Sequence, residues 1–325
     1  MIRALRRARI CRGALLLILL LGGCLARAEP SNLVRARPFE PRTEHPGPFE
    51  VGRLHLEAGF VLTSSDRRFG GLSGLLISAD GRALIAVSDR GLLWTAALRH
   101  DGDGRLLGLD DWAVIDLATI GEGAHAAGGD AEALAPAGEH GLVIAYEGAH
   151  RLLRIDLDDL SAPPSPLPMP SSLAPGNEGI EALAALPDGD LLALAEGIRD
   201  AGGDLAAWRN SETGIDRLSY VPTDGFVPTG ADRLDDRIYL VERRFSLLGG
   251  FASRVAVLSV DAVLPGARLR GAELARLGPT SISENFEGIA ARRGPDGRIL
   301  LYLVSDDNFL ALQQTLLLQF SLLEP

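Results

Sequence analysis

The 325-residue sequence contains no lysine: all 32 of its basic residues are arginine. A Schiff-base lysine and a P-loop lysine are therefore excluded, whereas arginine remains suited to bidentate binding of anions. The formal net charge is -11 at pH 7. Because nucleic-acid binding depends on neutralising phosphates, this charge argues against nucleic acid as a partner.

Cysteine is almost absent. Cys11 and Cys24 are the only two, and both lie in the first 28 residues. The rest of the chain therefore has neither a disulfide nor a thiol nucleophile. Two other catalytic patterns are also missing, the Gly-x-Ser-x-Gly nucleophile elbow and a paired-histidine zinc motif.

Residues 1–28 have the features of a signal peptide. Five arginines precede an apolar run, Ala14 to Leu21, which is too short to span a bilayer as a stable helix. Ala26-Arg27-Ala28 fits the small-x-small rule of ordinary secretion, whereas Leu21-Gly22-Gly23-Cys24 resembles a bacterial lipobox whose cysteine is lipidated. Both cleavage sites remain open. We expect a periplasmic or secreted protein that contacts the membrane only through a lipid anchor at Cys24, if it has one.

Residues 29–48 contain five prolines and predict an extended linker. Residues 49–325 show no break in composition and predict one domain, which we expect to be monomeric. It is long enough to bury a large core without disulfides.

The clearest structural pattern is residues 178–197. An apolar run, a Pro187-Asp188-Gly189 turn and a second apolar run predict a β-hairpin. Glu181 lies near the start of the first strand and Glu196 at the end of the second. Because the strands are antiparallel, both carboxylates should lie at the same end of the hairpin.

The same unit occurs five times. The acids that end the second strand are separated by 58, 49, 46 and 64 residues, and they are Asp89, Glu147, Glu196, Glu242 and Asp306. Short strands recurring about every 50 residues with Gly turns are typical of a β-propeller. We therefore predict an all-β propeller of four-stranded blades, with five blades. Six is the alternative, because the pattern is weak between Glu196 and Ser219, where residues 198–204 predict a loop. Residues 49–62 have no hairpin partner and are expected to close the ring.

In a propeller, the first strand of each blade lines the central channel. This places five side chains around the channel mouth: Ser73, Glu132, Glu181, Thr229 and Glu287. The five acids that end the second strands should lie beside them. Carboxylates gathered in this way repel one another unless a cation compensates them. Ca²⁺ fits best and Mg²⁺ second, and the predicted metal ligands are Glu132, Glu181, Glu196, Glu242, Glu287 and Asp306. The alternative is that backbone N–H groups and nearby arginines satisfy these acids.

Three elements carry a family resemblance: residues 71–91, the hairpin at 178–196, and the pair Asn285-Phe-Glu-Gly-Ile with Ser305-Asp-Asp-Asn308. Together they resemble the bacterial family named "esterase-like activity of phytase", or phytase-like, over roughly residues 50–320. The resemblance implies an exported β-propeller with phosphoester or ester hydrolase activity. Calcium dependence is implied by analogy with propeller phytases.

These observations predict a calcium-dependent hydrolase of a small anionic phosphoester or ester, acting at the acidic channel mouth. The expected catalytic residues are Glu181, Glu287, Arg90, Arg243 and Arg244, with the arginines gripping phosphate. Two alternatives remain open. One is a non-catalytic propeller that binds a ligand or partner at the cell envelope, and the other is a lactonase-like propeller.

Overall fold

The computed structural model describes residues 34–41, 48–121, 129–170, 179–212 and 214–323. The predicted signal peptide, Cys24 and Glu178 lie outside these residues. Within them the chain is all-β, and apart from strands it contains only two 3-10 segments, η1 (Leu117–Thr119) and η2 (Val260–Ala262). No helix in this described part is long and apolar enough to cross a membrane.

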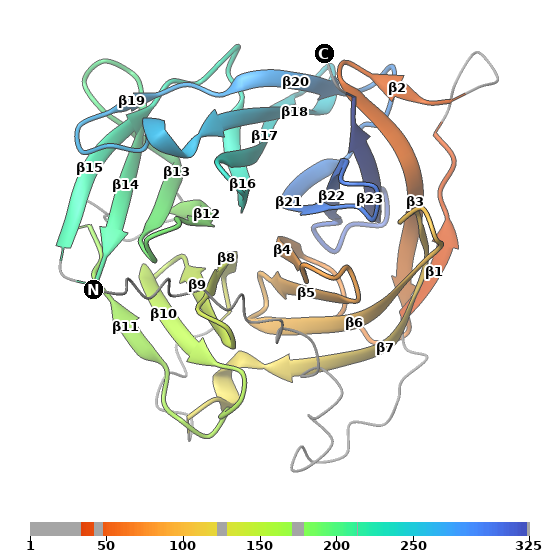
Figure 1. Ribbon diagram of the computed structural model, residues 1–325, viewed down its shortest axis with the longest axis horizontal. Coiled ribbons are helices and arrows are strands. Elements are labelled where there is room, and N and C mark those ends of the chain that lie inside the picture. The colour runs from red at the N-terminus through yellow and green to blue at the C-terminus, as the bar shows by residue number, and fades with distance from the viewer. Residues whose placement is uncertain (1–33, 42–47, 122–128, 171–178, 213, 324–325) are drawn as a thin grey trace, which may run out of the picture.

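The strands form five sheets arranged as blades around a centre (Figure 1). Blade 1 contains β4 (Leu72–Ile77), β5 (Ala83–Ser88), β6 (Leu92–His100) and β7 (Leu106–Asp116). Blade 2 contains β8 (Ala131–Ala137), β9 (Gly141–Tyr146), β10 (Arg151–Asp156) and β11 (Ser165–Leu167). Blade 3 contains β12 (Ile180–Ala185), β13 (Leu191–Arg199), β14 (Leu205–Ser211) and β15 (Gly214–Tyr220).

Blade 4 contains β16 (Val227–Leu234), β17 (Arg237–Ser246), β18 (Gly250–Ser259) and β20 (Ala272–Leu277), while the short β19 (Arg268–Leu269) pairs with β15 of blade 3. Blade 5 contains β21 (Asn285–Arg293), β22 (Ile299–Asp306) and β23 (Thr315–Leu322) from the end of the chain. Its next strand, β3 (Leu54–Ser64), comes from the beginning and pairs with β23. The predicted closure by an N-terminal strand is confirmed, and the count is five rather than six.

Two stretches differ from the sequence-based expectation. The weak pattern after Glu196 contains strands β14 and β15, and the loop between β13 and β14 is confined to residues 200–204. Part of the stretch expected to be linker, Val34–Pro38, is strand β1, which pairs with β3 at the outer edge of blade 5. The short β2 (Glu50–Val51) pairs with β3 as well. Proline is compatible with such an edge position, where one side of the backbone needs no ladder partner.

Each inner hairpin turns where a residue adopts a left-handed conformation. In the hairpin that joins β12 and β13, Gly189 has a φ of 92° and its N–H donates to the carbonyl of Leu186. In blade 4 the equivalent turn has no glycine, and Asp235 takes a φ of 56° instead. Asp and Asn tolerate this region better than other non-glycine residues.

The core consists of five apolar clusters, one between each pair of neighbouring blades. The cluster between blades 5 and 1 contains Trp94 and Trp112 of blade 1 packed with Leu317 of blade 5 and Phe60 of β3. Because this cluster joins the last blade to the first, the ring is closed. Every blade and every cluster lies within residues 34–323.

Candidate active site

Five β-bulges surround one end of the channel. In each inner strand the pairing with the second strand skips one residue close to the strand start. A bulge leaves an extra residue out of the ladder and redirects its side chain. The five skipped residues, here called the inner ring, are Ser73, Glu132, Glu181, Thr229 and Glu287. They are the five residues that the sequence predicted around the channel mouth.

A second set of side chains lies beside the inner ring, one from each second strand. In each blade, the residue just before the bulge pairs with one residue of the second strand. From blade 1 to blade 5 these partners are Ser88, Tyr146, Ala195, Glu242 and Ser305. The residue after each partner therefore occupies the same place in every blade. These five residues, here called the outer ring, are Asp89, Glu147, Glu196, Arg243 and Asp306.

Glu242 is consequently not part of the mouth, and the expectation that it joins the other acids is not met. Arg243, rather than Glu242, is equivalent to the outer-ring acids of the other blades. A shift of one residue along a strand places the side chain on the opposite face. Glu242 is fully buried against blade 3, where Tyr220 donates to it and Arg254 forms an ion pair with it. Arg243, the next residue, takes the outer-ring place that an acid holds in the other blades.

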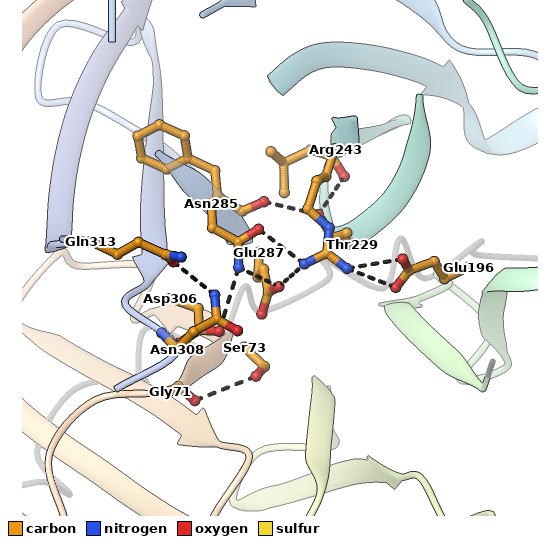
Figure 2. A network of polar contacts seen from close by, with 12 residues as sticks. Gly71, Ser73, Glu196, Thr229, Arg243, Asn285, Glu287, Asp306, Asn308 and Gln313 are labelled. Carbon is orange, nitrogen blue, oxygen red and sulfur yellow. Dashed lines mark hydrogen bonds and ion pairs between the residues drawn. The ribbon is translucent and has the colours of Figure 1, made fainter. Parts of the chain in front are cut away.

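Arg243 connects three blades at the mouth (Figure 2). Its Nη2 donates to both carboxylate oxygens of Glu196, at 2.9 and 3.0 Å. Its Nη1 donates to Glu287 and, at 2.9 Å, to Oδ1 of Asn285. The guanidinium therefore pairs with one carboxylate from blade 3 and one from blade 5, and its single charge offsets one of the two negative charges.

Asn285 was not predicted as a site residue, although the motif that contains it was noted. It is fully buried, and its Nδ2 donates to Glu287 at 2.8 Å and to Asp306 at 3.4 Å. Because its Oδ1 accepts from Arg243 at the same time, Asn285 holds two carboxylates and the guanidinium in a fixed arrangement. No sequence signal distinguished it from a strand-start residue.

The opposite side of the mouth contains Glu132, Glu147 and Glu181. Glu147 accepts the backbone N–H of Gly179. Burial, followed by the charge of Glu287, raises the pKa of Glu132 to about 9. Burial, followed by the charge of Glu132, raises the pKa of Glu181 well above its usual range. The pKa of Glu147 is also raised, chiefly by burial. These three glutamates form a cluster that favours protons or another cation.

The remaining acids of the outer ring are Asp306 and Asp89. Asp306 is buried, and its pKa is raised to about 8 by burial and by the charge of Glu287, although it accepts the N–H of Asn308 at 2.7 Å. Asp89 is half-buried, and burial raises its pKa to about 6 against the opposing charge of Arg90. Seven carboxylates and one guanidinium thus surround the mouth.

The other two predicted phosphate-binding arginines lie apart from the glutamates. Arg90 stacks over the ring of Phe309, 3.2 Å from its centroid, and donates to the carbonyl of Arg67. Arg244 points to the opposite side of β17 from Arg243, stacks over Phe226 and donates to the carbonyl of Asp224. Both are exposed on the same side of the propeller as the mouth, but only Arg243 contacts its carboxylates.

The donor set can be tested against the implied Ca²⁺. Glu132, Glu147 and Glu181 offer the hard oxygen ligands that Ca²⁺ prefers, and burial is the main reason that their pKa values are raised. Glu196 and Glu287 fit less well, since both are already paired with Arg243. In the described part of the chain, no three acidic, His or Cys side chains form a ready-made metal site. The residues therefore fit Ca²⁺ in their chemistry, and binding would require their side chains to converge.

Comparisons with solved structures find distant likenesses. The solved structure of a luciferin-regenerating enzyme shares 10% identity with this chain, with a TM-score of 0.42. The endo-arabinase from Bacteroides thetaiotaomicron shares 14% identity, with a TM-score of 0.46. Each of these likenesses covers 80% of this chain and 96% of the other. A GH43_1 enzyme from Xanthomonas citri shares 10% identity over 77% of this chain and 87% of its own, with a TM-score of 0.46. Likenesses this distant carry no information about activity.

No curated protein matches the sequence. The model of one family, described as "Phytase-like: Esterase-like activity of phytase", matches residues 67–309, a range that includes every residue of both rings. The chain belongs to the phytase-like family.

Proposed function

We propose that this protein is an exported hydrolase that cleaves a small phosphoester or carboxylic ester at the channel mouth, with Ca²⁺ as its cofactor and Mg²⁺ as the second choice. The observation that carries the proposal is the presentation of Glu132, Glu181 and Glu287 by equivalent bulges at one mouth, in a member of the phytase-like family.

Glu132, Glu147 and Glu181 are the residues that would hold the ion. When bound, Ca²⁺ would supply a Lewis acid for the ester oxygen and a water of lowered pKa. Without the ion, a pKa of about 9 keeps Glu132 largely protonated at neutral pH, so it could instead donate a proton to a leaving alcohol.

Arg243 is the residue that would bind the anionic part of the substrate. All of its contacts to Glu196 involve Nη2, and the side chain of Glu196 is 28% exposed, compared with 7% for Glu287. A phosphate or carboxylate entering from the mouth would therefore replace Glu196, while Glu287 and Asn285 keep the guanidinium oriented. Arg90 and Arg244 have no part in this step.

The test is an EDTA-treated protein titrated with Ca²⁺ or Mg²⁺, with thermal unfolding and hydrolysis measured in parallel. The substrates are an aryl phosphate, an aryl acetate and an aliphatic lactone. A ligand that binds only the folded state must raise the unfolding midpoint as it saturates. We expect Ca²⁺ to raise the midpoint and to support turnover, and Glu132→Gln or Glu181→Gln to abolish both effects.

Glu212→Gln provides the matched control, because Glu212 is an exposed acid in the turn between β14 and β15. An unchanged midpoint and no turnover would contradict the proposal and favour the non-catalytic, ligand-binding alternative. Lactone hydrolysis without phosphatase or esterase activity would favour the lactonase-like alternative.

The proposal includes location. The mature chain would be periplasmic or secreted, as a monomer, with a lipid on Cys24 if the lipobox is used. Mass spectrometry of the mature N-terminus after expression of the full chain distinguishes the cases. A chain beginning at Glu29 indicates ordinary secretion, one beginning at a modified Cys24 indicates an anchor, and an uncleaved chain contradicts export.

A further inference from the structure

The large exposed apolar side chains of the described residues are unevenly distributed. There are seven: Leu107, Phe245, Leu247, Leu248, Leu264, Leu310 and Leu312. Five of them, here called the apolar rim, lie in two places: Phe245 at the end of β17 with Leu247 and Leu248 in the turn that follows, and Leu310 and Leu312 in the segment after β22. Leu247 and Leu312 are 94% and 97% exposed, so these two side chains make almost no contact with the rest of the protein.

Both places are on the side of the propeller that carries the channel mouth. Strand β17 passes mouth level at Arg243 and turns into β18 at residues 247–249. Strand β22 reaches mouth level at Asp306, where it pairs with Asn285, and residues 307–314 follow. The other two apolar side chains lie towards the far side: Leu107 is near the start of β7, and Leu264 follows the end of β18 and η2. The apolar rim is therefore specific to the mouth side of blades 4 and 5.

We propose that the apolar rim docks on the surface of a lipid bilayer. The position at which the N-terminal segment joins the propeller supports a bilayer as the partner. Strand β1 begins at Val34, which pairs with Ser64 at the mouth-side end of β3 in blade 5. Val34 follows Cys24 by ten positions, a span of roughly 35 Å at most. A lipid anchor would therefore hold this side of the propeller, rather than the far side, towards the membrane.

Two arginines next to the apolar rim are also suited to contact with a lipid bilayer. Arg244 lies at the base of the β17–β18 hairpin, and Arg90 stacks over Phe309, the residue before Leu310. Such stacked guanidinium groups can reach lipid phosphates while neighbouring leucines enter the acyl region. The net charge of -11 opposes attraction to anionic lipids, so the apolar side chains must supply most of the binding. We therefore expect binding to zwitterionic vesicles that changes little with salt.

The experiment uses residues 29–325, which contain all five blades and core clusters, and sedimentation with phosphatidylcholine vesicles at low and high salt. We expect L247S/L248S to lower the partition coefficient roughly tenfold or more, because two leucines lose their apolar burial. L107S/L264S makes the same change on the far side and should bind as the unaltered protein does. All four leucines are at least half exposed, so both variants should fold. Their melting curves check this point.

A second measurement locates the contact. Leu248→Trp should show a blue shift of its fluorescence on addition of vesicles, and Leu264→Trp should show none. The native Trp94, Trp112 and Trp208 are buried, so they should contribute little to the change. Three results would overturn the proposal: no binding of the unaltered protein, equal losses in both double variants, or a dimer in light scattering that L247S/L248S dissociates. The last would mean that a second copy covers the rim.

Discussion

Arg243 on β17 and Glu287 on β21 form an ion pair that joins blades 4 and 5 beside the channel. Glu287 is buried, and Arg243 supplies its opposing charge, which partly offsets the rise of its pKa caused by burial. The pair lies where the sequence predicted a metal ion between carboxylates. In this half of the mouth, the protein provides its own cation.

The first prediction concerns the removal of that cation. Arg243→Met leaves the buried Glu287 with the hydrogen bond from Asn285 but without an opposing charge, and we expect a loss of about 3 kcal/mol in the free energy of unfolding at neutral pH. The pKa of Glu287 is already above its unfolded value, so its protonated form predominates in the folded state at low pH. The loss should therefore be smallest near pH 4.5 and increase as the pH rises.

Urea unfolding of Arg243→Met at acidic and alkaline pH measures this loss. Arg293→Met is the matched control, because Arg293 pairs with Asp235 at the surface, where both side chains are 53% exposed. It should cost less than about 1 kcal/mol at either pH. Equal losses in the two variants would contradict a buried role for Arg243.

The second prediction concerns Glu132 in the absence of divalent cations. Its folded pKa is about 9, well above the unfolded value near 4.5. The folded state therefore keeps a proton that the unfolded state releases, and stability falls as the pH rises between these values. The slope is at most about 1.4 kcal/mol per pH unit. Glu132→Gln resembles the protonated form and should remove this contribution.

We expect Glu132→Gln and the unaltered protein to have similar stability near pH 5, and the variant to be the more stable one at pH 8. Urea unfolding in EDTA at several pH values checks this divergence. Glu212→Gln should leave the pH profile unchanged, since Glu212 is exposed. Parallel profiles for Glu132→Gln and the unaltered protein would show that Glu132 is ionised in the folded state.

The sequence could predict the five hairpins and the inner ring because turn residues and apolar runs recur in register. It could not predict which of two adjacent residues faces the mouth. Glu242 and Arg243 both end an apolar run, and only the pairing of Pro228 with Glu242 shows that Arg243 is equivalent to Glu196. Asn285 was missed for a related reason: its role depends on contacts with β17 and β22, which are far away in sequence.

The third prediction concerns the close approach of two inner strands. A Cβ added to Gly230, the residue after the bulge at Thr229, would lie 2.3 Å from the carbonyl oxygen of Glu287. This atom belongs to the backbone of the neighbouring blade, so it cannot move independently. We expect Gly230→Ala to cost about 1–3 kcal/mol and to displace Glu287. Gly102→Ala, in a turn with no atom within 4 Å of the new Cβ, should have little effect, and equal effects would contradict the close approach.

The last prediction concerns the hydroxyl group of Tyr302, which joins blade 5 to blade 1. Arg292 and Gln319 donate to it at 2.9 and 2.8 Å, so its own proton is directed to Nε2 of His100, 2.9 Å away. His100 must then be neutral, in agreement with its pKa of about 4, which burial and the charge of Arg292 lower. Tyr302→Phe leaves these buried groups without their shared partner, and we expect a loss of about 2–3 kcal/mol.

Tyr239→Phe is the control that separates this network from the loss of any buried hydroxyl. Tyr239 is as buried as Tyr302, but its hydroxyl has no hydrogen-bond partner within the described residues. Removing that hydroxyl should change stability by less than about 0.5 kcal/mol, or increase it, because an unsatisfied polar group is removed from the interior. Denaturant unfolding of the two variants gives the comparison. If Tyr302→Phe unfolds at the same denaturant concentration as Tyr239→Phe, the hydroxyl of Tyr302 does not contribute to ring closure, which then depends on the pairing of β3 with β23 and on the apolar cluster between blades 5 and 1.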